Sequence, residues 1–193
     1  MSRKEDDFIQ VPAKYIDRVI GNYNPVTIIT TRNEQNLTNA APYAMCMEVC
    51  HRPAMFVLSV RNVKDTYRNV KDHGEFVINV PGKELLGKLM ITAVRYPPEV
   101  SEMVKAGLRE LPGIVVNAAR IRECKLHFEC QVEWIHPAGN HFVILGKVVS
   151  VTAHKEILTE AYRVKFDELK PVHYVGRGTR KFFGVGEMIT VKK

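Results

Sequence analysis

Residues 37–45, "LTNAAPYAM", form a small, uncharged segment that can donate and accept hydrogen bonds where a β-strand is expected. A planar ligand with acceptors along one edge needs backbone N–H groups and a neutral amide close by, and small side chains permit that approach. The alternative is an edge strand whose small residues pack against a helix. The segment therefore predicts a flat-ligand site, with candidate residues Thr38, Asn39, Ala40, Ala41 and Pro42.

A second segment, "SVRNVKDT" at residues 59–66, joins the end of an expected strand to the first turn of an expected helix. A helix N-terminus offers unpaired N–H groups and a positive dipole to an anion, and cations and hydroxyls complete a phosphate site. The candidates are Ser59, Val60, Arg61, Lys64 and Thr66. The alternative is that Asp65 or Thr66 only caps the helix and that the cations are solvated.

Other patterns that could carry chemistry are weak. The cysteine spacings Cys46/Cys50 and Cys124/Cys130 do not match a zinc or thioredoxin-like motif, so buried reduced thiols are expected. His136 and His141 have no convincing third metal ligand. No Gly-rich segment follows a strand into a helix, so a Rossmann domain is not expected. The sequence thus predicts no metal site and no catalytic side chain, and any chemistry falls to a cofactor.

Composition limits the class of protein. With 193 residues and 46% hydrophobic content, one globular domain is expected. The net charge of +7 favours anionic partners. The Lys and Arg residues are scattered, however, which makes nucleic acid an unlikely partner. No segment has the length and apolarity of a signal or membrane span, and we expect a cytoplasmic protein.

The periodicity predicts a mainly β protein. β-Branched runs predict mostly antiparallel strands, and apolar residues at helical spacing predict three short helices around them. The simplest architecture is a closed or split β-barrel with peripheral helices. A further short helix is expected near 13–20, and an ordered C-terminal arm from Phe166 onward. Strands are expected at 24–32, 37–45, 54–61, 75–81, 119–135 and 141–154, and helices at 63–74, 83–94 and 99–108.

Four segments in this order carry a resemblance: "NPVTIITT", "LTNAAPYAM", "RPAMFVLSVRNVKDTYRNV" and "EFVINVP". Two later segments, "HFVILGKVVSV" and "FFGVGEMI", strengthen it. With these segments the chain resembles the flavin reductase-like family of FMN-binding split barrels, which includes flavoredoxins and archaeal ferric reductases. The expected organisation is an N-terminal lead-in over 1–23 and a split-barrel domain over 24–193. The resemblance implies a homodimer with FMN near the interface, and electron transfer from NADH, NADPH or a protein donor to an acceptor.

The resemblance also implies roles for individual residues. Asn39 and its neighbouring backbone would contact the flavin, and Pro42, Tyr43 and Met45 would shape the wall of its site. The segment around Lys64 would hold the flavin's phosphate. His141 and Tyr174 match positions that approach the flavin, where an imidazole could act electrostatically. Glu102 departs from the pattern, because many relatives carry Lys there. Two alternatives remain open: a basic β-barrel that binds nucleic acid, and a flavin carrier without turnover.

Overall fold

The structure is a computed structural model that describes residues 12, 25–176, 180–184 and 186. The helix expected near 13–20 and the expected boundary between residues 23 and 24 lie outside the described residues.

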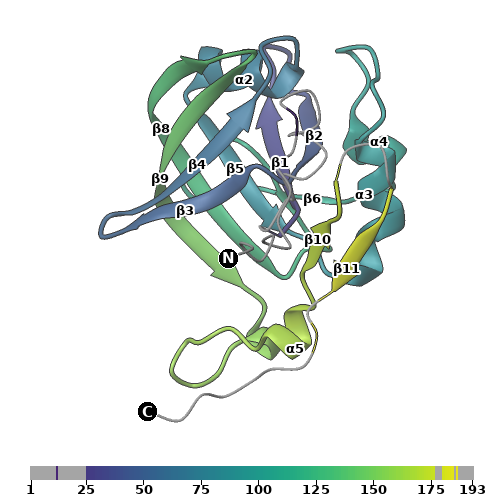
Figure 1. The fold of residues 1–193 in the computed structure, drawn as a ribbon, viewed down its shortest axis with the longest axis vertical. Helices are drawn as coiled ribbons and strands as arrows, with labels where there is room; N and C mark the ends of the chain where they lie inside the picture. Colours follow the sequence, from purple (N-terminus) through teal and green to yellow (C-terminus); the bar gives the residue numbers. More distant parts are fainter. Residues whose placement is uncertain (1–11, 13–24, 177–179, 185, 187–193) are drawn as a thin grey trace, which may run out of the picture.

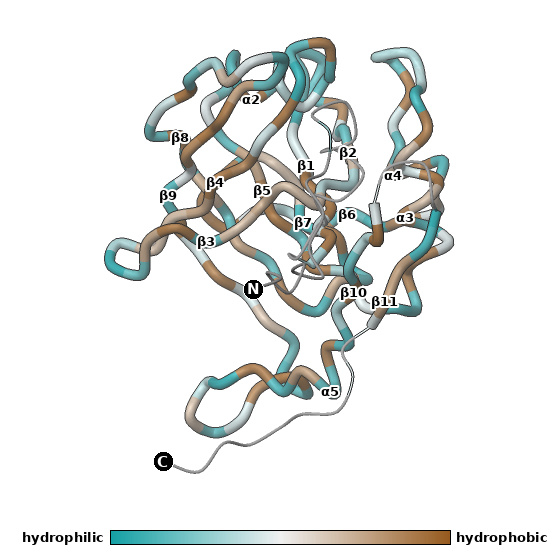
Figure 2. The backbone as a smooth tube through the Cα atoms, viewed as in Figure 1, coloured by the Kyte–Doolittle hydropathy of each residue, from teal (hydrophilic) through white to brown (hydrophobic). Residues whose placement is uncertain are grey.

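Seven antiparallel strands form one continuous sheet, in the order β2-β1-β5-β8-β9-β4-β3. The β-branched and aromatic runs of the sequence supply most of these strands, because such side chains pack well on a pleated surface. The hydropathy colouring in Figure 2 shows the apolar segments along the strands and a hydrophilic tip on the β3–β4 hairpin. The strands are β1 (Thr27–Arg32), β2 (Thr38–Tyr43), β3 (Cys46–His51), β4 (Ala54–Val60), β5 (Glu75–Val80), β8 (Leu126–Ala138) and β9 (His141–Ala153).

The sheet is rolled into a barrel (Figure 1). Its two edge strands, β2 and β3, are joined by only Ala44 and Met45, so the two edges must lie close together. The inside is filled by apolar side chains from the strands, among them Phe76 and Ile144. The expected mainly β, mostly antiparallel split barrel with peripheral helices is therefore confirmed.

Some strand boundaries differ from the expectation. The long strand expected over 119–135 is divided into β7 (Arg120–Ile121) and β8, because the chain turns where the Cys124 N–H donates to the Ile121 carbonyl at 3.0 Å. The turn between β8 and β9 is confined to Gly139 and Asn140, with Gly139 at φ 61°. Strand β3 was not predicted, because it exposes Met47 and Val49 as well as Glu48 and His51 and so shows no apolar–polar alternation.

The three helices expected around the barrel are present, each shorter than predicted, and a further short helix in the C-terminal arm was not expected (Figure 1). α2 (Asp65–His73) lies across one end of the barrel. Asn69 on it donates to the Thr31 hydroxyl at 2.9 Å, and Val70 enters the barrel core. A 3-10 turn (Lys83–Leu85) leads into α3 (Leu86–Thr92), which packs with α4 (Glu102–Lys105) outside β2.

The C-terminal arm follows β9 and lies along the outside of the barrel. The Val26 N–H donates to the Val172 carbonyl at 2.8 Å, which ties the arm to the chain just before β1. The described part of the arm is thus ordered over the domain, as predicted. None of the helices in the described part of the chain has the length and apolarity needed to cross a bilayer. The remaining elements are β6 (Glu110–Leu111), a 3-10 turn (Lys155–Ile157), α5 (Phe166–Leu169), β10 (Val172–Tyr174) and β11 (Phe182–Gly184).

Candidate functional site

The free edge of β2 is held by the beginning of α4. The Ala40 N–H donates to Glu102 Oε2 at 3.1 Å, and Ser101 Oγ donates to the Thr38 carbonyl at 2.8 Å. Pro42, two residues further along the strand, has no N–H. The Ala40 N–H, a backbone donor expected to be available to a ligand, is therefore bound to the Glu102 carboxylate.

The N-terminus of α2 lies beside β2 and carries no side-chain cap. Lys64 is the N-cap residue, and its side chain forms no capping hydrogen bond. Asp65 pairs instead with Arg68 one turn later, and the Thr66 hydroxyl accepts a hydrogen bond from Asn39 Nδ2 at 3.2 Å. Neither Asp65 nor Thr66 forms the side-chain cap that the alternative expected, whereas Lys64 is exposed, as the same alternative expected. The first-turn N–H groups keep the positive end of the dipole open to an anion.

A cleft of about 190 Å³ opens between β2, the start of α2 and the segment after α3. We call it the β2–α2 cleft. It brings together six of the predicted residues, from two segments of the sequence. It also contains residues that the sequence analysis did not propose as ligand contacts: Val63, Asp65 and the run 92–96. The predicted residues in the cleft are Asn39, Ala41, Pro42, Tyr43, Lys64 and Thr66.

An apolar pocket of about 210 Å³ adjoins the cleft and shares Pro42, Tyr43 and Ala93 with it. Tyr174 reaches this pocket from the C-terminal arm, and its ring packs against Phe182 with a centroid distance of 5.4 Å. The predicted Tyr174 thus lies on the same ligand-sized surface as the end of β2. A polar cleft continuous with an apolar pocket suits a ligand that is charged at one end and flat and apolar at the other.

The electrostatics of the cleft are set by burial. Burial raises the pKa of Tyr43 to about 12, the Thr66 side chain acting in the opposite direction, so the phenol stays protonated at neutral pH. Its hydroxyl is buried and has no hydrogen-bond partner among the described residues. Burial also raises the pKa of Glu102, while the N–H groups of Glu102 and Ala40 and the charge of Lys64 lower it.

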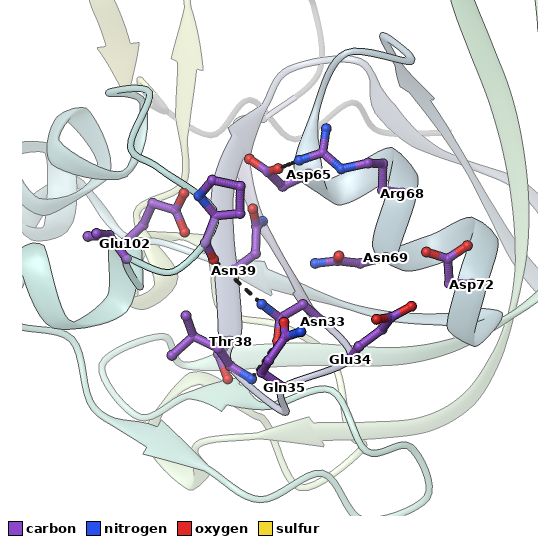
Figure 3. A pocket seen from close by; sticks show the side chains of 13 residues that line it. Asn33, Glu34, Gln35, Thr38, Asn39, Asp65, Arg68, Asn69, Asp72 and Glu102 are labelled. Atoms are coloured by element: carbon purple, nitrogen blue, oxygen red, sulfur yellow. Dashed lines mark hydrogen bonds and ion pairs between the residues drawn. The ribbon is translucent and has the colours of Figure 1, made fainter.

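Thr38 lines a second cavity, which shares Asn39 with the β2–α2 cleft (Figure 3). Ala40 is fully buried against the helices, and Val60 is 1% exposed inside the barrel. The other four predicted residues line neither the β2–α2 cleft nor the apolar pocket, and their roles remain predictions. They are Met45 before β3, Ser59 near the end of β4, the exposed Arg61 after it, and His141 at the start of β9.

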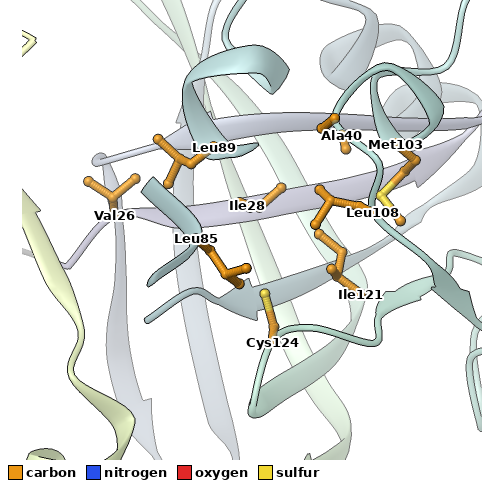
Figure 4. Close-up of a cluster of buried hydrophobic side chains, with 10 residues drawn as sticks. Val26, Ile28, Ala40, Leu85, Leu89, Met103, Leu108, Ile121 and Cys124 are labelled. Carbon is orange, nitrogen blue, oxygen red and sulfur yellow. The ribbon is translucent and has the colours of Figure 1, made fainter. Parts of the chain in front are cut away.

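The packing of α3 and α4 explains the small residues of β2. Leu89 of α3 and Met103 of α4 lie over Ala40 and Ile28 (Figure 4). A larger side chain at position 40 would push the helices away from the strand. Ala40 therefore follows the helix-packing alternative, whereas the next residue, Ala41, lines the cleft.

Glu102→Gln is expected to make the protein more stable than the wild type at pH 7. The raised pKa means that the folded state holds the proton more tightly than the unfolded chain does. Ionised Glu102 therefore costs stability as the pH rises above its usual value of 4.5, and the glutamine avoids this cost. The amide oxygen can still accept the Ala40 N–H. Urea unfolding at several pH values measures the difference, which should shrink towards pH 4.5.

The exposed Glu99 in the same segment provides the matched control, and Glu99→Gln should follow the wild type at every pH. A Glu102→Gln variant that is less stable at pH 7, or whose difference from the wild type is independent of pH, contradicts the assignment.

Comparisons with known proteins agree with this fold. Residues 21–181 match a family model described as the flavin reductase like domain. An uncharacterized protein of Aquifex aeolicus (strain VF5) is 33% identical over 157 residues, which cover 79% of this chain and 80% of that protein. Nitrilotriacetate monooxygenase component B from Bacillus cereus is similar with a TM-score of 0.86 and 25% identity, covering 99% of this chain and 98% of its own. Flavoredoxin of Desulfovibrio vulgaris (Miyazaki F) is similar with a TM-score of 0.79 and 20% identity, and the match covers 87% of this chain and 90% of that protein.

Proposed function

Because the chain belongs to the flavin reductase like family, we propose that it is an FMN-binding oxidoreductase of the flavin reductase or flavoredoxin type. It transfers electrons from NADH, NADPH or a protein donor through FMN to an acceptor. The observation that carries this proposal is the β2–α2 cleft, where Asn39, Lys64 and Thr66 meet at the uncapped N-terminus of α2.

The residues of the site fit FMN. Lys64, the Thr66 hydroxyl and the first-turn N–H groups of α2 would hold the phosphate. The Tyr43 hydroxyl, buried without a partner in the described part of the chain, can donate to a ligand acceptor. Pro42 and Tyr174 line the apolar pocket, where a flat ring would be shielded from water. FMN supplies the electron-transfer chemistry when it is bound.

The side chains of the site bind and orient rather than react. Lys64 places a positive charge in the cleft, and Glu102 fixes the edge of β2 through the Ala40 N–H. Asn39 is held by its hydrogen bond to Thr66, so its amide is oriented before a ligand arrives. This preorganisation lowers the ordering cost of binding. The electrostatic role of His141 also remains part of the proposal.

The proposal includes a homodimer and a reducing, cytoplasmic location. Strand β3 is an edge of the sheet, and together with the residue before it exposes apolar side chains: Met45, Met47 and Val49 are 41%, 46% and 48% exposed. Such a row favours burial against a second copy of the chain. It begins two residues after Tyr43, which brings the interface close to the cleft. All four cysteines are free thiols, which suits a reducing compartment.

Titration of the purified protein with FMN tests the proposed function. We expect quenched flavin fluorescence, a shifted visible absorption spectrum and saturation at about one FMN per chain. A colourless protein that leaves FMN fluorescence unchanged contradicts the proposal.

Oxidation of NADH and of NADPH in the presence of FMN then separates a reductase from a flavin carrier. An oligonucleotide binding assay at low salt tests the nucleic-acid alternative, for which we expect no retention.

A further inference from the structure

A further pocket of about 330 Å³ adjoins the β2–α2 cleft, and we call it the Arg95 pocket. It shares Asp65, Arg95 and Tyr96 with the cleft. Asp65 is the first residue of α2 and follows Lys64, so the pocket lies at the end of the cleft where the flavin phosphate is proposed to bind. A ligand held by its phosphate at this helix N-terminus could therefore continue into the pocket. The lining residues are Asp65, Arg68, Arg95, Tyr96, Pro97 and Pro98.

The Arg95 pocket carries a net positive charge. Arg95 and Arg68 line it together with a single carboxylate, that of Asp65. Arg95 is exposed and has no hydrogen-bond or ion-pair partner in the part of the chain that the structure describes. Arg68 pairs with Asp65 one turn earlier on α2, as the dashed line in Figure 3 shows. This pair positions Arg68 and still leaves N–H groups of its guanidinium for a ligand. Two guanidiniums at one pocket suit a phosphate group.

The rest of the wall suits a flat ring. Tyr96 is half-buried, and its ring contacts no other ring among the described residues. Pro97 and Pro98 follow it, and prolines have no N–H group to present to a ligand. The turn is held in place, because the Pro97 carbonyl accepts the Val100 N–H at 2.9 Å. A nucleic-acid base can stack on an aromatic ring or a guanidinium plane, so the wall can take a base beside the arginines.

We propose that the Arg95 pocket binds an adenosine monophosphate group, with its phosphate on Arg95 and Arg68 and its adenine against Tyr96. The inference rests on the proposed function, which puts the flavin phosphate at the N-terminus of α2. Arg68 lies one helical turn from Lys64, about 5.4 Å along the axis, which a second phosphate linked to the first can span. FAD has this group where FMN ends, and NADH and NADPH also carry it.

Isothermal titration of AMP into the FMN-loaded chain tests the proposal. AMP should bind at least about tenfold more tightly than adenosine, because only AMP carries the charge that the arginines recognise, and its affinity should fall as salt is added. The FMN absorption spectrum should show that the flavin stays bound. Arg95→Gln and Arg68→Gln should each weaken AMP binding about fivefold or more. Arg68→Gln should affect FMN binding less, since Arg68 does not line the β2–α2 cleft.

Arg163→Gln changes an exposed arginine outside the pocket and is the matched control, which should bind AMP as the wild type does. Equal binding of AMP and adenosine overturns the proposal, as does AMP binding that neither Arg95→Gln nor Arg68→Gln weakens. Displacement of FMN by AMP also overturns it, because AMP would then occupy the flavin phosphate site.

Two further titrations identify which molecule supplies the group. If FAD is the source, it should bind the flavin-free chain at least about tenfold more tightly than FMN, and Arg68→Gln should remove the difference. If the nicotinamide donor is the source, NAD⁺ or NADP⁺ should compete with AMP on the FMN-loaded chain. A failure of both overturns the proposal. Failure of FMN to bind contradicts the proposed function, whereas arginine-dependent AMP binding to the flavin-free chain would still support the pocket.

Discussion

Lys64→Ala is expected to weaken FMN binding by about 1–3 kcal/mol, roughly a 5- to 150-fold rise in the dissociation constant. The variant removes the charge that the β2–α2 cleft places at the N-terminus of α2. A charge-assisted hydrogen bond to phosphate is stronger than a neutral one, and the helix dipole alone does not replace it. Fluorescence titration with FMN measures the effect, which should become smaller at high salt.

Two variants on the same helix make this result specific. Lys71→Ala removes an exposed cation from the last turn of α2, outside the cleft, and should bind FMN as the wild type does. Thr66→Ala removes a hydroxyl and also the acceptor of the Asn39 amide at 3.2 Å, so it should weaken binding by a comparable amount. Unchanged FMN affinity in both Lys64→Ala and Thr66→Ala refutes the assignment of the phosphate site.

Glu129→Ala is expected to lower the free energy of unfolding by about 3–5 kcal/mol. The Glu129 side chain is 1% exposed in β8, and its carboxylate accepts the N–H groups of Ile114, Val115 and Val116 at 2.7–3.2 Å. Arg120 Nε lies 3.6 Å away. Removing the carboxylate leaves the three backbone donors without their acceptor. It also removes the counter-charge of Arg120, whose guanidinium still donates to the Pro112 carbonyl and the Thr152 hydroxyl. Urea unfolding followed by circular dichroism measures the loss.

Glu133→Ala, an exposed change further along β8, is the control and should stay within about 0.5 kcal/mol of the wild type. Glu129→Gln should fall between the two, because its amide oxygen can still accept some of the three N–H groups. If Glu129→Ala unfolds at the same urea concentration as the wild type, the loop 112–117 is held to the barrel by other contacts.

The sequence by itself determined the class of fold and the two segments that we propose as the ligand site. β-Branched runs separated by turn residues are a local signal, and they predicted most strands of the barrel and the hairpin across Gly139. The small residues around Ala41 and the cation and hydroxyl around Thr66 are also local patterns. Both now lie in one cleft.

Tertiary structure decided which side chain of each segment faces the cleft. Successive residues of a strand point to opposite faces, so the position of the barrel and helices assigns Ala40 to the core and Ala41 to the cleft. The sequence contains both alanines but not the packing that separates them. The sequence analysis also missed β3. Its apolar residues are exposed, so the periodicity of the sequence gives no sign of an edge strand.

Tertiary structure also assembled every surface whose residues are far apart along the chain. Glu102 reaches the Ala40 N–H across 62 positions, and Tyr174 comes to Pro42 from the C-terminal arm. The cavity lined by Thr38 combines Glu34, Asp72 and Glu102 from three segments. A local pattern constrains only neighbouring residues, whereas these surfaces exist because the sheet closes on itself and the helices dock on it. Their charge and shape follow from that closure.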